Sequence, residues 1–474
     1  MPLGLLPPAL LSLVMAPAPS LPPMSAGEVS LGFDFGTSGA RCAAIAADGT
    51  LLCSPPPYSW GERERSQTAA DWTAALETLL DSLDVEVRSR VARIAISGTS
   101  STVTLVDART GLASTSRGPP RMYSFNVVRE CAEGERALEL IGAAAPAGSP
   151  ARAASSSLAK LLAWHLEHPL EPHEVLCHLA DYLAAQLCER VAADGSEASG
   201  GNPFCSDWHN ALKLGFDVRT LEYPKWILSG ALGEVAAGRL PRAVRPGAHL
   251  GNISAAASAR WGLPKRCVVT GGSTDSISAF LASGASEVGD AVTSLGSTLA
   301  LKMLSATPVD DDTRGVYSHR LGDLWLAGGA SNVGCAVLRE QGFDAAELVE
   351  CSARIDGLAP PPQPGYYPLP AATTGERFPV ADDRKAPMLS PVPEDRAEFL
   401  HSILHAIAAV EAEGYAALKQ LGASPLRRVF TAGGGAANDE WTRMREAMLG
   451  VEASRADNTD AAYGVALLAA RGDN

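Results

Sequence analysis

The sequence predicts an α/β fold built from two halves of similar design, which meet near Pro264. A strand-like run at residues 29–35 leads into a Gly/Thr/Ser turn at 36–39 and a returning strand. The same pattern recurs at residues 291–304, around a second such turn. With 474 residues, 46% of them hydrophobic, the chain can bury the cores of two domains. We therefore expect a duplicated α/β architecture. The expected divisions are a leader at residues 1–28, an N-terminal domain at 29–264 and a C-terminal domain at 265–474.

The first half opens with a predicted three-stranded meander. Asp48-Gly49 is a strong hairpin signal between the strand-like runs at 41–47 and 50–53. Thr68 and Asp71 have the spacing of a capping box, and apolar residues at helical spacing follow them. The remaining predicted elements of this half are strands at 93–97 and 103–106, helices at 157–166 and 174–189, and a Gly-rich loop at 192–202.

The second half combines short apolar strands with helices in the same way. Residues 268–270 form a predicted buried strand, and Gly271-Gly272-Ser273-Thr274 lead from it into a helix. A long amphipathic pattern at 396–421 predicts the longest helix of the chain. The other predicted elements are strands at 291–295, 299–304, 316–321, 324–327 and 428–431, a Pro/Gly-rich loop at 360–384, and helices from Asn438 and from Asp460.

Composition excludes several classes of function. The net charge of −14 disfavours a general affinity for nucleic acid or for an acidic membrane surface. A nucleotide-binding protein of this charge needs local neutralisation, most simply by Mg²⁺. The nine cysteines are scattered without a CxxC pair, which indicates reduced, mostly buried thiols.

The first 30 residues differ in kind from the rest of the chain. They contain no Lys or Arg, and an apolar stretch at 3–15 is interrupted by Pro7 and Pro8. This stretch is too short and too broken to span a membrane. It is similar to the apolar core of a signal peptide but lacks the basic start. A targeting segment and a disordered leader, with translation starting near Met24, remain equal alternatives.

Three Gly-rich turns follow short apolar strands, at residues 36–39, 296–298 and 433–435. Glycine lets backbone N–H groups approach an anion closely, and neighbouring Thr and Ser hydroxyls add donors. For any one of these turns, a simple hairpin is the better explanation. The three together, with acids beside the first two, favour phosphate binding from two sides of a cleft.

Two aspartates stand where phosphoryl transfer needs them. Asp34 lies at the end of the first strand, and Asp275 lies where a helix follows residues 268–272. Transfer to an alcohol needs a base near the hydroxyl and a metal to neutralise the phosphates. Asp275 suits the base, and Asp34 suits the metal or its waters. The alternative for Asp275 is an acid that satisfies backbone N–H groups at a helix start.

Other nucleotide-dependent classes lack their motifs. Asp34-Phe35-Gly36 matches the protein-kinase DFG triplet, but no His-Arg-Asp loop or Val-Ala-Ile-Lys strand accompanies it. There is no GxxxxGK[ST] loop, which excludes the P-loop class.

Taken in order, the motifs after Val29 resemble those of the FGGY carbohydrate kinase family. Each alone is weak to moderate, whereas their order is specific. The matching segments are Asp34-Phe35-Gly36-Thr37-Ser38-Gly39-Ala40-Arg41 (DxGTxxxR), residues 206–211 with 223–226 (TDxxNA and YPxW), 271–275 (GGxxD), 295–298 (SLGTS), 374–379 (GERxP) and 433–441 (GGGxxNxxW).

The resemblance implies two ribonuclease H-like domains of the actin and hexokinase type, with a cleft between them. It also implies transfer of the γ-phosphate of ATP, with Mg²⁺, to a sugar hydroxyl. Asp275 is then the catalytic base, Asp34 the metal site, and Asp34, Ser100 and Asp275 contact the sugar. The implied ATP-binding residues are Gly36, Thr37, Ser38, Arg41, Gly296, Ser297, Thr298, Gly434, Gly435 and Asn438.

Within the family, the short chain and its opening motif look most like the plant and cyanobacterial branch described as D-ribulose kinases. That branch is plastid-targeted, so we expect a plastid location if the source is a plant or alga, and a cytoplasmic one otherwise. The expected partners are a sugar and ATP, with neither nucleic acid nor membrane.

This sequence departs from relatives in ways that bear on the substrate. Residues 122–126 lack the acid of the MYxDxR stretch, and Ser276 replaces the glutamine that follows the base in glycerol kinases. Glycerol is therefore disfavoured and a ketopentose preferred. The alternatives are D-xylulose, a sugar alcohol, or a catalytically silent actin-like protein that binds nucleotide or sugar. Retention of Asp34, Thr37 and Asp275 together argues against the silent protein.

Overall fold

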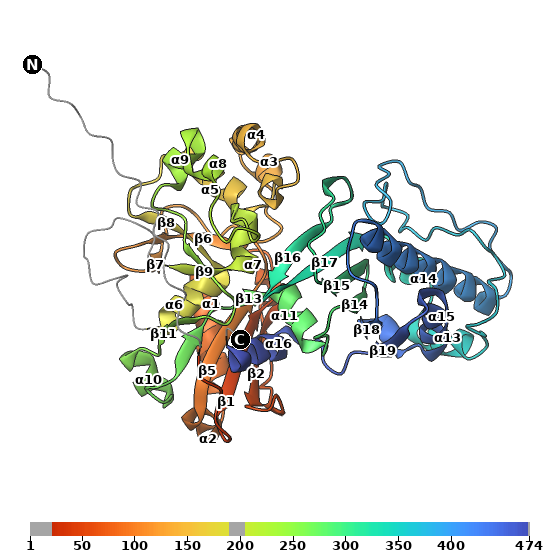
Figure 1. Cartoon of the computed structure of the whole chain (residues 1–474), viewed down its shortest axis with the longest axis horizontal. Helices are drawn as coiled ribbons and strands as arrows, with labels where there is room; N and C mark the ends of the chain where they lie inside the picture. Colours follow the sequence, from red (N-terminus) through yellow and green to blue (C-terminus); the bar gives the residue numbers. More distant parts are fainter. Residues whose placement is uncertain (1–20, 189–203, 473–474) are drawn as a thin grey trace, which may run out of the picture.

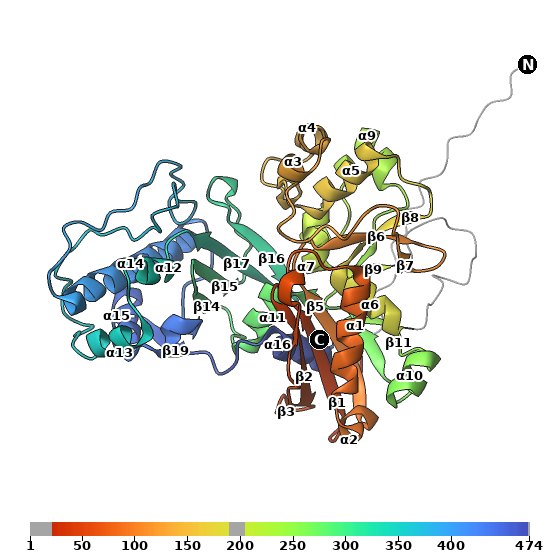
Figure 2. The same ribbon diagram turned by 180° about the vertical axis from the view of Figure 1, so that it is seen from behind.

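The computed structural model describes residues 21–188 and 204–472. The first 20 residues of the expected leader and the loop expected at 192–202 lie outside the described residues. Within the described part, two lobes are each built on a mixed β-sheet (Figures 1 and 2).

The sheet of the first lobe has eight strands, in the order β11-β12-β5-β1-β2-β3, with β13 on β5 and β4 on β2. Its centre is β1, which is antiparallel to β2 and parallel to β5. The strands are β1 (Val29–Phe35), β2 (Gly39–Ala46), β3 (Leu51–Cys53), β4 (Tyr58–Ser59), β5 (Val91–Gly98), β11 (His249–Asn252), β12 (Val268–Thr270) and β13 (Ser273–Thr274).

The sheet of the second lobe has six strands in the order β16-β17-β15-β14-β18-β19. Its central β14 is antiparallel to β15 and parallel to β18, as β1 is to β2 and β5. The predicted duplication is therefore confirmed in the pairing of the strands. The strands are β14 (Asp290–Leu295), β15 (Leu299–Ser305), β16 (Tyr317–Leu321), β17 (Leu324–Ser331), β18 (Arg428–Ala432) and β19 (Glu452–Arg455).

Two small sheets enlarge the first lobe. One has the order β7-β6-β8 and the other pairs β10 with β9. Their strands are β6 (Val103–Asp107), β7 (Leu112–Ala113), β8 (Glu174–His178), β9 (Cys205–Asp207) and β10 (Arg242–Val244).

Helices cover both lobes, and each lobe has its own large hydrophobic cluster. Those that precede the second lobe are α1 (Ala69–Asp81), α2 (Val85–Ser89), α3 (Val127–Glu130), α4 (Gly134–Ala144), α5 (Ser157–Glu167), α6 (Leu179–Leu187), α7 (Trp208–Ala211), α8 (Lys225–Leu228), α9 (Gly230–Ala236), α10 (Ala255–Trp261) and α11 (Asp275–Ala282). The later ones are α12 (Ala336–Glu340), α13 (Ala345–Ser352), α14 (Arg396–Gln420), α15 (Asp439–Leu449) and α16 (Ala461–Arg471).

The division between the lobes does not coincide with the boundary expected near Pro264. Strands β12 and β13, which follow Pro264, pair with β5 of the first sheet. The C-terminal helix α16 also returns to the first lobe and packs on β1 and α11 (Figure 1). The backbones approach so closely there that a Cβ on Gly32 would lie 2.0 Å from the Ala462 carbonyl oxygen. Glycine is therefore required at this contact.

Local predictions held except in one segment. Thr68 and Asp71 form the predicted capping box of α1. The helix expected at 174–189 is wrong in its first part, because β8 occupies Glu174–His178 and α6 begins only at Leu179. All five residues of β8 are buried and pair with β6. A short, fully buried strand has no alternating pattern, so its sequence is not distinguished from that of a helix.

Two further observations concern the described residues. Among them no helix is long and apolar enough to cross a membrane. All nine cysteines are free thiols, but only four of them are buried and five are partly exposed, so the expectation that most are buried is wrong.

Candidate active site

Asp34 is the last residue but one of β1 and is 2% exposed. The Ser97 hydroxyl of β5 donates to its Oδ1 at 2.8 Å, and an Arg41 guanidinium nitrogen lies 3.9 Å from its Oδ2. Burial, together with the nearby carboxylates of Asp275 and Asp460, raises the pKa of Asp34 to about 7, against the opposing effects of Ser97 and Arg41. The carboxyl of Asp34 is thus held in place and is poised between its two protonation states at neutral pH.

Asp275 begins α11 on the other side of β5. The strand register places Asp34 opposite Ser97 and places Thr274 opposite Gly98. Both aspartates therefore stand at the carboxyl end of β5, one on each side. Burial also raises the pKa of Asp275, while the Ser276 N–H at 2.6 Å and the ammonium groups of Lys302 and Lys213 favour its charged form.

The two aspartates line one wall of a cavity of 1130 Å³ between the lobes, called here the site cavity. The first lobe contributes Gly36, Thr37 and Arg41 from the β1–β2 turn and strand β2. The second lobe contributes the glycine loop after β18, including Gly433 and Gly434. The segment from the end of β19 to the start of α16 completes the lining; its residues are Arg455, Ala456, Asp457, Asn458, Thr459, Asp460 and Ala461.

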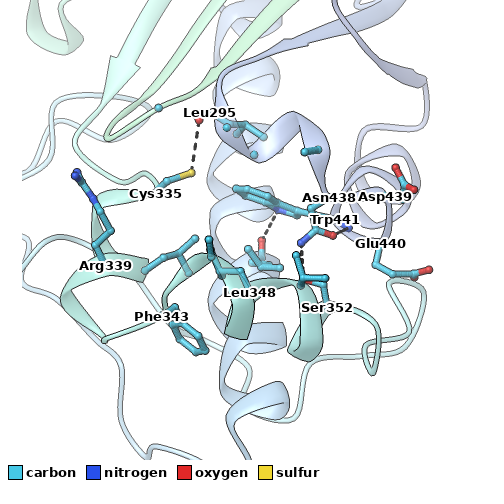
Figure 3. A pocket seen from close by; sticks show the side chains of 18 of the residues that line it. Leu295, Cys335, Arg339, Phe343, Leu348, Ser352, Asn438, Asp439, Glu440 and Trp441 are labelled. Carbon is cyan, nitrogen blue, oxygen red and sulfur yellow. Dashed lines mark hydrogen bonds between the residues drawn. The ribbon is translucent and has the colours of Figure 1, made fainter.

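A second cavity of 770 Å³, called here the apolar cavity, lies within the second lobe (Figure 3). Trp441 forms one wall, and its indole N–H donates to the Leu404 carbonyl at 3.0 Å. Asn438 is fixed by a hydrogen bond from its amide to the Ser352 hydroxyl, 2.8 Å away. A Cβ on Gly435 would lie 2.5 Å from the Trp441 ring, so only glycine fits there. Gly434 lines both cavities, which are therefore adjacent.

The structure brings together most of the predicted site residues. Asp34, Gly36, Thr37, Arg41, Asp275 and Gly434 line the site cavity. Gly296, Ser297, Gly434, Gly435 and Asn438 line the apolar cavity. Three predicted residues line neither one: Ser38, Ser100 and Thr298. Ser38 and Thr298 are exposed beside lining residues, and Ser100 lies in the turn that follows β5.

Several residues of the site have no counterpart among the sequence-based candidates. Asp460 caps α16 through the Ala462 N–H and also acts on Asp34. Lys213 and Lys302 come from opposite lobes and both act on Asp275. The Lys302 ammonium donates to the Ser276 carbonyl at 2.6 Å. Only Lys213 carried a usable signal, since it follows the segment at 206–211 by two residues.

Residues 291–472 match a family model described as "FGGY family of carbohydrate kinases, C-terminal domain". This part of the chain is similar to the C-terminal domain of the FGGY carbohydrate kinases. The match spans the second sheet, except for Asp290, together with α16. It includes the motifs at 295–298 and 433–441.

Solved structures of sugar kinases share the fold over nearly the whole chain. A protein described as a "xyloylose kinase" from Brucella ovis is 20% identical with a TM-score of 0.75, and the match covers 94% of this chain and 91% of that one. Xylulose kinase from Rhodospirillum rubrum is 21% identical with a TM-score of 0.73, covering 94% and 90%. Plasmodium falciparum glycerol kinase with ADP is 15% identical with a TM-score of 0.72, covering 93% and 88%. The expected two-domain fold of the actin and hexokinase type is thus confirmed.

Proposed function

We propose that the protein transfers the γ-phosphate of ATP to a hydroxyl of a ketopentose, with D-ribulose as the first candidate and D-ribulose 5-phosphate as the product. The observation that carries this proposal is the pair of aspartates at the end of β5, in a cavity that adjoins an apolar cavity through Gly434. The two adjoining cavities match the two parts of a nucleotide, because a nucleotide joins a flat base to a polyanionic phosphate chain. The first lobe is then the N-terminal domain of the same kinase.

In this proposal the apolar cavity holds the adenine and the site cavity holds the phosphates and the sugar. Trp441 and the glycines beside it offer a flat apolar surface for the base. The β1–β2 turn and the glycine loop after β18 line the site cavity from opposite lobes and offer backbone N–H groups to the phosphates, to which Thr37 adds a hydroxyl and Arg41 a positive charge. The turn at 296–298 would approach the phosphates from the adjoining apolar cavity, which Gly296 and Ser297 line.

Asp275 is proposed to accept the proton of the sugar hydroxyl. Its raised pKa brings it closer to neutrality, where a general base is most effective. Lys213 and Lys302 keep enough positive charge nearby for the carboxylate form to persist. These roles place the sugar between Asp275 and the γ-phosphate.

The site fits Mg²⁺ that arrives with the nucleotide. Within the described part of the chain no group of three or more His, Cys, Asp or Glu residues could hold a metal alone. Mg²⁺ commonly binds through one or two carboxylates, several waters and the substrate phosphates. Asp34 would supply the carboxylate, directly or through water. The ion would neutralise the charge of the phosphates during transfer.

An assay of ADP release against D-ribulose, D-xylulose, ribitol and glycerol tests the proposal. D-ribulose should give the highest kcat/KM. Three of the similar structures are described as xylulose kinases, so D-xylulose is the second candidate. Preference for D-xylulose or ribitol would reassign the sugar while keeping the kinase. No sugar-dependent release from folded protein that binds ATP would favour a silent nucleotide-binding protein.

Thr37→Val is expected to weaken use of MgATP by about tenfold or more, because a hydrogen bond to a charged group contributes about 1.5–3 kcal/mol. Thr37 lines the site cavity and is half-buried there. Steady-state kinetics should show a higher KM for MgATP or a lower kcat, with little change in the KM for sugar. Ser38→Ala, beside it but outside the cavity, should stay within about twofold. A change confined to the sugar KM would move this turn to the sugar site.

A further inference from the structure

Lys160 on α5 is a buried lysine without an ion-pair partner among the described residues. Its side chain is 0% exposed. The amine donates to the carbonyl oxygens of Ser101 and Met122, each at 2.8 Å. Burying an ammonium group away from water costs free energy unless the group is well hydrogen-bonded. Both acceptors are backbone carbonyl oxygens of loops, so these hydrogen bonds fix the conformation of the two loops.

The first of these loops is the turn at residues 99–102, called here the β5 turn. Ser101 has φ 64°, in the left-handed region that a residue with a Cβ rarely adopts. The Thr102 N–H donates to the Thr99 carbonyl at 3.2 Å, and the hydroxyls of Thr99 and Thr102 lie 2.6 Å apart. These bonds close the turn at its ends. Lys160 instead holds the carbonyl of the strained residue itself.

The second loop is tied to the β5 turn at the same point. The Tyr123 N–H donates to the Thr102 hydroxyl at 3.0 Å, one residue after the Met122 carbonyl that Lys160 binds. Lys160 therefore bridges two loops that already touch. Loss of its amine would release both carbonyls at once.

The β5 turn leaves the sheet between the two aspartates of the site. Its first N–H, from Thr99, donates to the Phe35 carbonyl next to Asp34 at 3.2 Å. Two buried hydroxyls at this end of β5 lack a hydrogen-bond partner, those of Ser101 and Thr274. An unpartnered buried hydroxyl is destabilising, so the side chains of Ser101 and Thr274 do not themselves hold this end of β5 in place.

We propose that Lys160 is a positioning residue for the sugar: by holding the Ser101 carbonyl it fixes the β5 turn, and with it the end of β5 between Asp34 and Asp275 where the sugar would bind. This inference rests on the proposed kinase function. Lys160 does not itself touch the sugar in this arrangement. It acts through the backbone of the β5 turn, which leaves the sheet between Asp34 and Asp275.

The bridge does not depend on the charge of Lys160. Burial, together with the positive charges of Lys213 and Arg121, lowers its pKa to about 7, against the opposing effect of Glu130. A neutral amine still has two N–H groups, which match the two carbonyl acceptors. The turn should therefore keep its shape on both sides of neutral pH.

The test replaces Lys160 with methionine, which keeps the length of the side chain and removes the donors. K160M should raise the KM for the preferred sugar at least tenfold and leave the KM for MgATP within twofold. Amide hydrogen exchange should become faster in peptides that cover residues 99–103 and 121–124. The matched control is L161A, which truncates the next residue of the same helix, also 0% exposed. L161A should lower the melting temperature and leave the sugar KM and the exchange of the β5 turn near wild type.

A second variant separates backbone shape from general damage. Glycine adopts the left-handed conformation without strain, so S101G added to K160M should recover part of the lost sugar affinity relative to K160M alone. If K160M does not fold, K160Q retains amide donors at a similar position and should show an intermediate sugar KM with faster exchange of the turn.

Unchanged sugar KM and unchanged exchange at 99–103 in the folded variant would overturn the proposal. Equal increases of the sugar KM in K160M and L161A would also overturn it. If wild-type protein shows no sugar-dependent turnover, the proposed function fails separately. Amide hydrogen exchange of the β5 turn is then the remaining test of the Lys160 bridge. Faster exchange in K160M than in wild type supports the bridge, and equal exchange overturns it.

Discussion

Replacing Asp275 with asparagine is expected to lower turnover by about 10²–10⁴-fold, the usual contribution of a general base. Asparagine has nearly the same shape and can still accept the Ser276 N–H that Asp275 accepts at 2.6 Å. It cannot take a proton from a sugar hydroxyl. The binding of ADP, measured by calorimetry, should therefore change little while kcat for ADP release falls.

The matched control is Asp457→Asn, which removes an exposed carboxylate from the same cavity. This variant should keep turnover within a few-fold of wild type. The pH profile gives a second readout. Because the pKa of Asp275 is raised, wild-type activity should increase as pH rises through that pKa and the base loses its proton. Near-wild-type turnover of folded Asp275→Asn would remove Asp275 from the chemistry.

The sequence predicted those features of the fold that are set by residues close together in the chain, and it missed those set by distant contacts. The capping box at Thr68, the hairpin at Asp48-Gly49 and the long helix α14 are set by residues close together in the chain, and all three are present. The return of α16 to the first lobe is set by its packing on β1 and α11, far away in sequence. No local sequence pattern predicts that contact. The one related feature is Gly32, where a Cβ would clash with the backbone of α16.

The residues of the site likewise divide into those found in local motifs and those brought to the site by contacts between distant segments. Asp34, Thr37, Asp275 and Gly434 belong to short motifs at strand ends, so the sequence alone was enough to propose them. Asp460 reaches the cavity only because α16 folds back onto the first lobe. Lys302 and Lys160 lie within an ordinary strand and an ordinary helix.

Replacing Asp34 with asparagine is expected to abolish most activity and yet to stabilise the unliganded protein at pH 8. The ordinary pKa of an aspartate is about 3.8, and burial raises that of Asp34 to about 7 in the folded protein. Between these values the folded state holds a proton that the unfolded state has released. Stability therefore falls as pH rises from about 4 to about 7, and the loss is complete above that range.

The size of the effect follows from the same two values. A shift of one pKa unit corresponds to about 1.4 kcal/mol, so the ionised Asp34 carboxylate costs roughly 4 kcal/mol at pH 8. Asparagine carries no charge, and its side-chain oxygen can still accept the Ser97 hydroxyl that Asp34 accepts at 2.8 Å. Part of the cost is offset in the variant by imperfect packing of the amide. We expect a gain of several degrees in melting temperature at pH 8.

The measurement is a series of thermal unfolding curves at pH 5, 6.5 and 8 without nucleotide. The difference between Asp34→Asn and wild type should grow with pH, whereas exposed Asp457→Asn should leave the profile of the wild type unchanged. Adding MgADP should stabilise wild type more than Asp34→Asn, since the variant lacks the carboxylate proposed for the metal. Parallel curves for wild type and Asp34→Asn from pH 5 to 8 would mean that Asp34 carries no buried proton. The apparent conflict between stability and activity at Asp34 has a single cause: the buried carboxylate that destabilises the empty site is the group that the metal and its nucleotide require.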